Sequence, residues 1–101
     1  MTPSMASERS VLFRVFDQYF DLIQSGQKDF EARPATHYWS KVAGRRPKVA
    51  VFISGRRVHR RRILAIESAQ RPPEAVAYDA NLMVSFRGRR ALIFRLGEAI
   101  S

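Results

Sequence analysis

Short runs of alternating apolar residues recur along this chain, separated by glycine, proline and basic residues. Val11, Phe13 and Val15 alternate in the manner of a half-buried strand, and residues 49–53 form a dense β-branched and aromatic run. In so small a chain, many short strands must close or cover their edges, which favours a small barrel. We therefore predict an α+β fold, a small β-barrel of about six short strands with one or two short helices. The strands are predicted at 10–15, 28–33, 49–53, 57–67, 82–86 and 91–96.

Two segments carry helical signals. An apolar stripe predicts a helix over 16–24, and Gly26 stands where a helix C-terminal cap is expected. Thr36 can cap one or two helical turns over 35–42. Turns or loops are predicted at 44–47, 55–56, 69–81 and 87–90.

A length of 101 residues predicts a single domain, which we place at 11–101 after a polar N-terminal tail at 1–10. The chain has no cysteine, so disulfides and thiolate metal sites are excluded. No apolar stretch reaches the roughly 18 residues that a membrane span needs. These features predict a cytoplasmic protein without a membrane partner.

Charge is the strongest compositional signal, with a formal net charge of +9. Between Ala32 and Ile66 the chain has no acidic residue. Arginine predominates among the cations, and its guanidinium fork matches phosphate oxygens. A field of this size predicts a polyanionic partner, RNA or another nucleic acid. The basic residues of the acid-free window are Arg33, Lys41, Arg45, Arg46, Lys48, Arg56, Arg57, Arg60, Arg61 and Arg62.

Residues 19–33 contain Gly26, Lys28, Glu31 and Arg33 in the pattern G-x-K-x-x-E-x-R. This pattern resembles the signature of the ASCH domain, and residues 51–67 are similar to the next hairpin of that family. The resemblance covers roughly residues 11–67. It implies a PUA-like β-barrel, a fold common among RNA-binding proteins, with the motif strand bordering a cleft.

The motif side chains supply the first candidate site. Lys28 and Arg33 offer donors to phosphates or base edges, and Glu31 shares the polar face of the strand with Arg33. The alternative is a solvent-exposed ion pair of little energetic weight. Tyr38 and Trp39 could stack on a base beside a basic cleft, whereas Trp39 could equally cover the end of the barrel.

The basic run at 56–62 supplies the second candidate site. Strand alternation places Arg60 and Arg62 on one face, with Arg57, His59 and Arg61 on the other. Because both faces cannot belong to the core, we expect this run to project beyond the barrel or to form an edge strand. The candidate nucleic-acid-binding residues of this arm are Arg56, Arg57, Arg60, Arg61 and Arg62.

Whether the site is catalytic is left open by the sequence. One ASCH branch removes the acetyl group from acetylated cytidine with a Lys and a Thr three residues later, which correspond to Lys28 and Glu31 here. Glu31 acting as a base on water beside Lys28 is the hydrolase alternative, and Glu67 or Glu74 is the candidate for the family's distant carboxylate. A metal-independent ribonuclease would use Lys28, His37 or Tyr38. No metal or other cofactor is expected.

A module that binds an acidic protein is the third alternative to RNA binding. A nucleoside is the alternative ligand for a closed cleft, and the sequence leaves the oligomeric state open.

Overall fold

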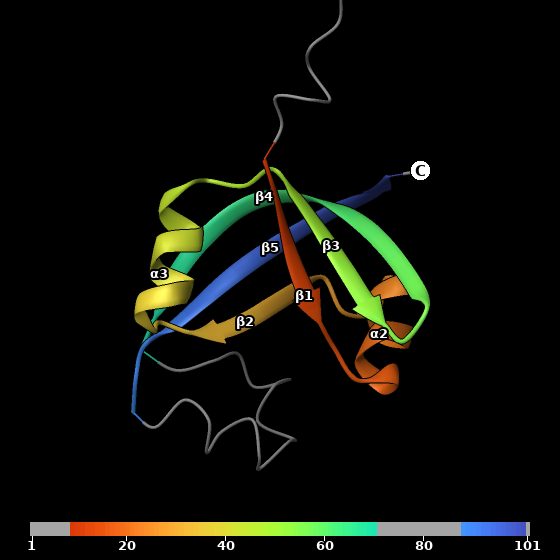
Figure 1. Cartoon of the computed structure of the whole chain (residues 1–101), viewed down its shortest axis with the longest axis horizontal. Helices are drawn as coiled ribbons and strands as arrows, with labels where there is room; N and C mark the ends of the chain where they lie inside the picture. The colour runs from red at the N-terminus through yellow and green to blue at the C-terminus, as the bar shows by residue number, and fades with distance from the viewer. Residues whose placement is uncertain (1–8, 71–87, 101) are drawn as a thin grey trace, which may run out of the picture.

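The computed structural model describes residues 9–70 and 88–100. Within them, five strands and two helices form an α+β structure whose single sheet curls into a half-barrel (Figure 1). The α+β prediction is confirmed, with five strands in the described residues where about six were predicted. The elements are β1 (Ser10–Arg14), α2 (Asp17–Gln24), β2 (Phe30–Pro34), α3 (His37–Gly44), β3 (Val49–Ser54), β4 (Arg57–Ala69) and β5 (Ala91–Ile100).

Some predicted features lie outside the described residues. The strand predicted at 82–86 is one of them, as is most of the loop predicted at 69–81. Of the tail predicted at 1–10, only Arg9 and Ser10 are described, and Ser10 already belongs to β1.

The strand order in the sheet is β1-β3-β4-β5-β2. β1 runs parallel to β3, with Phe13 beside Phe52, and the other neighbouring pairs are antiparallel. Parallel neighbours need a long crossover connection, which α2, β2 and α3 provide here. Among the described residues, β1 and β2 are therefore the two edge strands, while β4 lies between β3 and β5. Within the basic run, Arg57, Val58 and His59 pair with β3, and pairing with β5 begins at Arg60. The first half of the run thus has a strand on one side only within the described residues, and the second half lies inside the sheet.

Local signals account for the ends of the elements. The Oγ1 atom of Thr36 accepts a hydrogen bond from the backbone N–H of Trp39 at 3.1 Å, which confirms the predicted cap of α3. Gly26 follows α2 with a φ angle of +83°, and Gly55 turns the β3–β4 hairpin with a φ angle of +60°. Both angles favour glycine because a Cβ atom is strained there.

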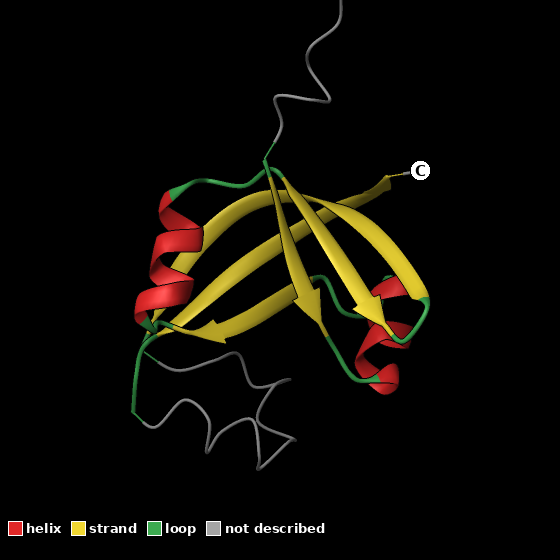
Figure 2. Ribbon diagram, in the orientation of Figure 1, coloured by secondary structure: helices red, strands yellow, loops and turns green. Residues whose placement is uncertain are grey.

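The main core takes side chains from the sheet and from both helices. Figure 2 shows the two helices at opposite ends of the curled sheet. The ring of Phe13 lies at the centre of the main core, with ring centroids 5.3 Å from Phe52, 5.4 Å from Trp39 and 5.0 Å from Phe94. From α2, Phe20 and Ile23 are fully buried against the same core, and no side chain of α3 is fully buried.

A second, smaller core lies on the opposite face of β2 and β5. It contains Phe30, Ala32, Ala91 and Ile93. Because side chains alternate along a strand, Glu31 points toward the main core beside its partner Phe94. Both faces of the first half of β2 are therefore buried.

Candidate functional site

The motif residues Lys28, Glu31 and Arg33 come together. Glu31 and Arg33 share a face of β2, as their spacing predicts, whereas Lys28 precedes the strand. The Nζ atom of Lys28 lies 3.2 Å from Oε1 of Glu31, and Arg33 donates through Nε to Oε2 at 3.0 Å. The side chains of Lys28, Glu31 and Arg33 are only 12%, 7% and 21% exposed. Each oxygen of the Glu31 carboxylate thus binds one cation, and the three side chains form a largely buried triad. The alternative of a solvent-exposed ion pair is wrong.

Aromatic rings hold the two cations of the triad. The Lys28 ammonium lies 5.1 Å from the centroid of Tyr19 and 5.2 Å from that of Phe30. Cation–π contacts of this kind are worth most where water is excluded. The guanidinium of Arg33 lies 5.2 Å from the ring of Phe13 and 5.1 Å from that of Trp39.

Trp39 is partly buried and packs against the main core. Its ring is stacked on Phe13 with an interplanar angle of 11°. Tyr38, its neighbour in α3, is 63% exposed and touches Trp39 only edge-on, with ring centroids 5.0 Å apart. The structure separates the two predicted stacking residues into one core ring and one surface ring.

The predicted alternation of the basic run in β4 is confirmed. Arg57 and Arg61 lie on the face of the sheet that packs against α2, and both contact that helix. Arg57 lies on the α2 side, with Nη2 2.5 Å from Oδ1 of Asp21 and Nη1 3.8 Å from Oδ1 of Asp17. Its guanidinium also covers the ring of Phe20, at 4.2 Å from the centroid. Arg57 therefore links β4 to α2 through these contacts.

Arg61 is buried and serves the fold. Its guanidinium donates to three backbone carbonyls, those of Gly97 at 2.6 Å and of Ile23 and Lys28 at 3.1 Å each. Burial lowers the pKa of Arg61 from its ordinary value, and Asp29 acts in the opposite direction. The bonds to Ile23 and Lys28 satisfy carbonyls where α2 ends and the motif begins, and the bond to Gly97 reaches β5. Arg61 is therefore not part of an exposed arm.

His59 lies beside Arg61 on the same face of the sheet. Its Nε2 atom is buried and has no hydrogen-bond partner within the part of the chain that the structure describes. Burial, and then the positive charge of Arg61, lowers the pKa of this imidazole.

The remaining predicted arginines face outward. Arg56 at the hairpin and Arg60 on β4 are exposed. Arg62 is half-buried, and its Nε atom lies 3.8 Å from Oε1 of Glu98. The five arginines predicted as one arm thus fall into two groups on opposite faces of the sheet.

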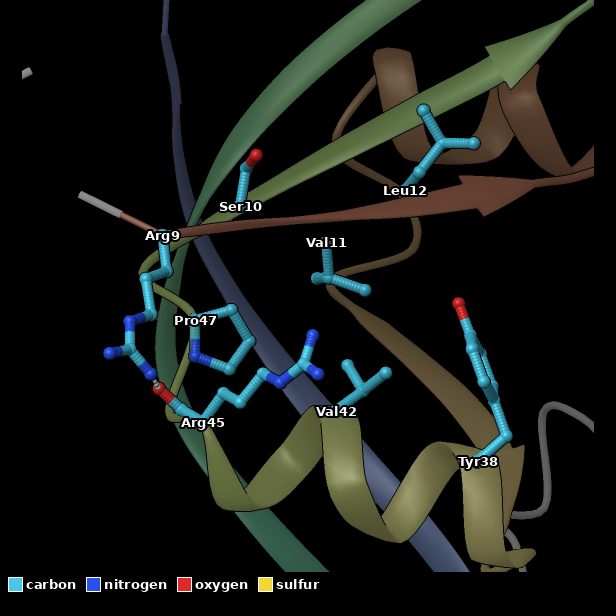
Figure 3. Close-up of a pocket in the computed structure, with 8 residues that line it drawn as sticks. All are labelled: Arg9, Ser10, Val11, Leu12, Tyr38, Val42, Arg45 and Pro47. Carbon is cyan, nitrogen blue, oxygen red and sulfur yellow. Dashed lines mark hydrogen bonds between the residues drawn. The ribbon is translucent and has the colours of Figure 1, made fainter. Parts of the chain in front are cut away.

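A groove between β1 and α3 was not anticipated from the sequence. Its volume is about 530 Å³, and Figure 3 shows Tyr38 at one end with Arg9 and Arg45 at the other. The Nη1 atom of Arg9 donates to the backbone carbonyl of Arg45 at 3.4 Å, which ties the start of β1 to the end of α3. The lining residues are Arg9, Ser10, Val11, Leu12, Tyr38, Val42, Arg45 and Pro47.

Further cations surround the Arg end of this groove. The N–H of Lys48 donates to the carbonyl of Arg9 at 2.8 Å, and that of Arg45 to the carbonyl of Lys41 at 3.2 Å. All of them are exposed, and among the described residues none has a carboxylate partner. We call this cluster the basic end; its members are Arg9, Lys41, Arg45, Arg46 and Lys48.

Sequence reasoning missed the groove because its two arginines are far apart in the chain. The sequence predicts Arg9 in the tail and Arg45 in a loop. The signal that could have found Arg45 is the acid-free window, which contains four of the five members of the basic end.

In comparisons with known proteins, no family model, curated protein or solved structure matches this chain. The helices among the described residues are too short and too polar to span a membrane.

Proposed function

We propose that this protein binds RNA through the basic end, on an ASCH-type, PUA-like half-barrel. The observation that carries the proposal is the segregation of charge. Elsewhere, several cations are engaged within the fold: Glu31 binds Lys28 and Arg33, and Glu67 lies 3.0 Å from Arg95. The exposed cations Arg14, Arg56 and Arg60 lie apart from the basic end, on β1, at the β3–β4 hairpin and on β4. At the basic end, five cations gather without a carboxylate among the described residues.

Such a cluster of like charges lowers the stability of the folded protein unless anions neutralise it. Like charges repel within the roughly 8–10 Å over which physiological salt leaves them unscreened. A phosphate chain relieves that repulsion and releases its own counterions on binding. The choice of RNA over DNA rests on the ASCH resemblance, carried by Gly26, Lys28, Glu31 and Arg33.

The hydrolase alternative has weaker support from this geometry. A general base must meet a water molecule, but the Glu31 side chain is only 7% exposed and each of its oxygens already accepts from a cation. Lys28 in turn is held between two rings. We therefore assign the triad to holding the fold together.

A titration against salt tests the proposal. Fluorescence anisotropy of a labelled single-stranded RNA of mixed sequence, repeated from 50 to 300 mM KCl, gives the slope of log affinity against log salt. The variant Lys41→Gln, Arg46→Gln, Lys48→Gln should flatten that slope by about 2, because each phosphate contact on a single strand contributes about 0.7. DNA of the same sequence measures the preference for RNA.

A charge-matched control removes three exposed cations elsewhere: Arg14→Gln, Arg56→Gln, Arg60→Gln. It should leave the slope close to that of the wild type. An equal loss in both triple variants would show that net charge alone attracts RNA and would contradict the assignment to the basic end. Failure of the wild type to bind at 50 mM salt would overturn the proposed function.

A further inference from the structure

The groove between β1 and α3 has two chemically different ends. Tyr38 stands on the first turn of α3 with its hydroxyl directed toward β1, opposite Leu12 (Figure 3). Arg45 follows two helical turns later, an axial rise of about 10 Å, with its guanidinium directed into the groove (Figure 3). An aromatic surface and a cationic one thus share one cavity of about 530 Å³, a size typical of small-molecule sites.

The aromatic end is held in place. Thr36 caps the turn that carries Tyr38, and the edge-on contact with Trp39 anchors its ring to the core. Even so, Tyr38 remains 63% exposed. A ring that is fixed by its neighbours and open to solvent can stack on a nucleic-acid base at little entropic cost, and any base can occupy it because every base has a π-face.

At the cationic end, a hydrogen bond places the Arg9 side chain beside the backbone of Arg45, whose own guanidinium points into the groove (Figure 3). The bond from Arg9 to the Arg45 carbonyl joins two segments far apart in sequence, and neither guanidinium has a carboxylate partner within 9–70 or 88–100. Two guanidinium forks present several N–H donors in planar geometry, which suits phosphate oxygens better than a compact ammonium would.

We infer that this groove binds one unpaired nucleotide unit, with its base on Tyr38 and a phosphate on Arg9 and Arg45. This inference rests on the proposed RNA binding and deepens it, because it makes the protein selective for single strands. In a duplex, bases are stacked and paired and cannot enter such a groove, whereas unpaired bases can be splayed onto an aromatic ring.

The first experiment compares single-stranded and duplex RNA of equal length in the anisotropy assay. The wild type should bind the single strand about tenfold more tightly. Tyr38→Leu should lose that preference, while Tyr38→Phe, which keeps the ring, should retain it. Phe16→Leu is the matched control, because Phe16 is an exposed aromatic residue at α2 outside the groove.

A second experiment tests the contribution of the cationic end and asks whether the ligand is a free nucleotide or an RNA strand. Arg45→Gln should reduce the salt slope by about 0.7. A titration with adenosine monophosphate, followed by the ring resonances of Tyr38 in NMR, tests a free nucleotide as ligand. Saturation at micromolar concentration would identify a mononucleotide site, and weak millimolar binding beside tight RNA binding would identify a strand; both support the nucleotide site.

Three results would overturn the inference. The first is equal affinity for single-stranded and duplex RNA, with the same affinities in Tyr38→Leu. RNA binding would then stand, but the groove would not be its site. Polyglutamate competing as well as RNA at equal charge would mean that the groove takes an acidic peptide. No binding of either RNA form by the wild type would overturn the groove and the proposed function together.

Discussion

The Nη2 atom of Arg33 donates to the backbone carbonyl of Arg14 at 3.1 Å, and this bond links the two edge strands of the curled sheet. Arg33 lies on β2 and Arg14 on β1, at opposite ends of the strand order. Arg33 also binds Glu31. One guanidinium therefore takes part both in the link between β1 and β2 and in the motif triad.

Removing a single charge from the triad should therefore destabilise the protein. Glu31→Gln leaves two cations with no anion in a mostly buried place, and we expect it to cost about 3 kcal/mol of unfolding free energy. Arg33→Met should cost about 2 kcal/mol, because it removes charge-assisted bonds to Glu31 and the link to Arg14. Urea unfolding measures both.

The control replaces the whole triad: Lys28→Met, Glu31→Leu, Arg33→Met. A buried ion cluster exchanged for apolar residues of similar volume is often neutral in stability, so the triple variant should be more stable than Glu31→Gln. If the three substitutions instead destabilise additively, the triad contributes through its individual contacts and not as a neutral unit.

A second prediction contrasts two neighbours in β4. Arg61→Ala removes three hydrogen bonds to backbone carbonyls in buried or partly buried places, so it should cost about 3 kcal/mol. In a domain of this size, that loss lowers the thermal midpoint by about 12 °C or more. Arg60→Ala, exposed on the opposite face, should shift the midpoint by less than about 2 °C. Similar shifts for the two variants would refute the buried role of Arg61.

The burial of His59 predicts a pH dependence of stability. Its pKa is lowered in the folded protein, so the unfolded chain takes up a proton near pH 6.5 while the folded chain does not. The unfolded state then binds more protons, and stability present above pH 6.5 is lost as the pH falls below it. The unfolding free energy should fall between pH 7 and 5.5 by at most about 1.4 kcal/mol per pH unit.

His59→Gln should flatten this dependence, since glutamine does not titrate. A dependence that survives in His59→Gln would assign the proton uptake to another group.

Local features of the fold could be predicted from the sequence. The stripe ending before Gly26, the cap at Thr36 and the turn at Gly55 each depend on neighbouring residues, so short windows reveal them. The parallel pairing of Phe13 with Phe52 depends on a distant crossover and leaves no local signature. The same holds for the central position of β4.

The candidate site was predictable to the same degree. Spacing alone places Glu31 and Arg33 on one face of the strand, whereas Lys28 joins them because β2 begins only at Phe30. The spacing does not say that Glu31 faces the main core, because Phe30 and Ala32 fill a second core on the other face. The alternation of apolar and polar residues shows that the two faces of a strand differ. It does not show which face is the more buried. The pairing of Arg9 with Arg45 requires the folded chain.

The final prediction links helix capping to RNA binding through Thr36. Thr36→Ala removes the acceptor of the Trp39 N–H and should cost about 1 kcal/mol, while Thr36→Ser should restore most of it. Because the first turn of α3 carries Tyr38, fraying of that turn should also weaken single-stranded RNA binding more than duplex binding. Unfolding curves and the anisotropy assay measure the two effects.

Phe16 offers the opposite test at α2, where it occupies the N-cap position without a side-chain cap and is 70% exposed. Phe16→Ser supplies a capping oxygen and should raise stability by up to about 1 kcal/mol. Since α2 lies outside the groove, RNA affinity should not change. If Thr36→Ala lowers stability yet leaves the preference for single strands intact, the ordered turn that carries Tyr38 is not what selects unpaired RNA.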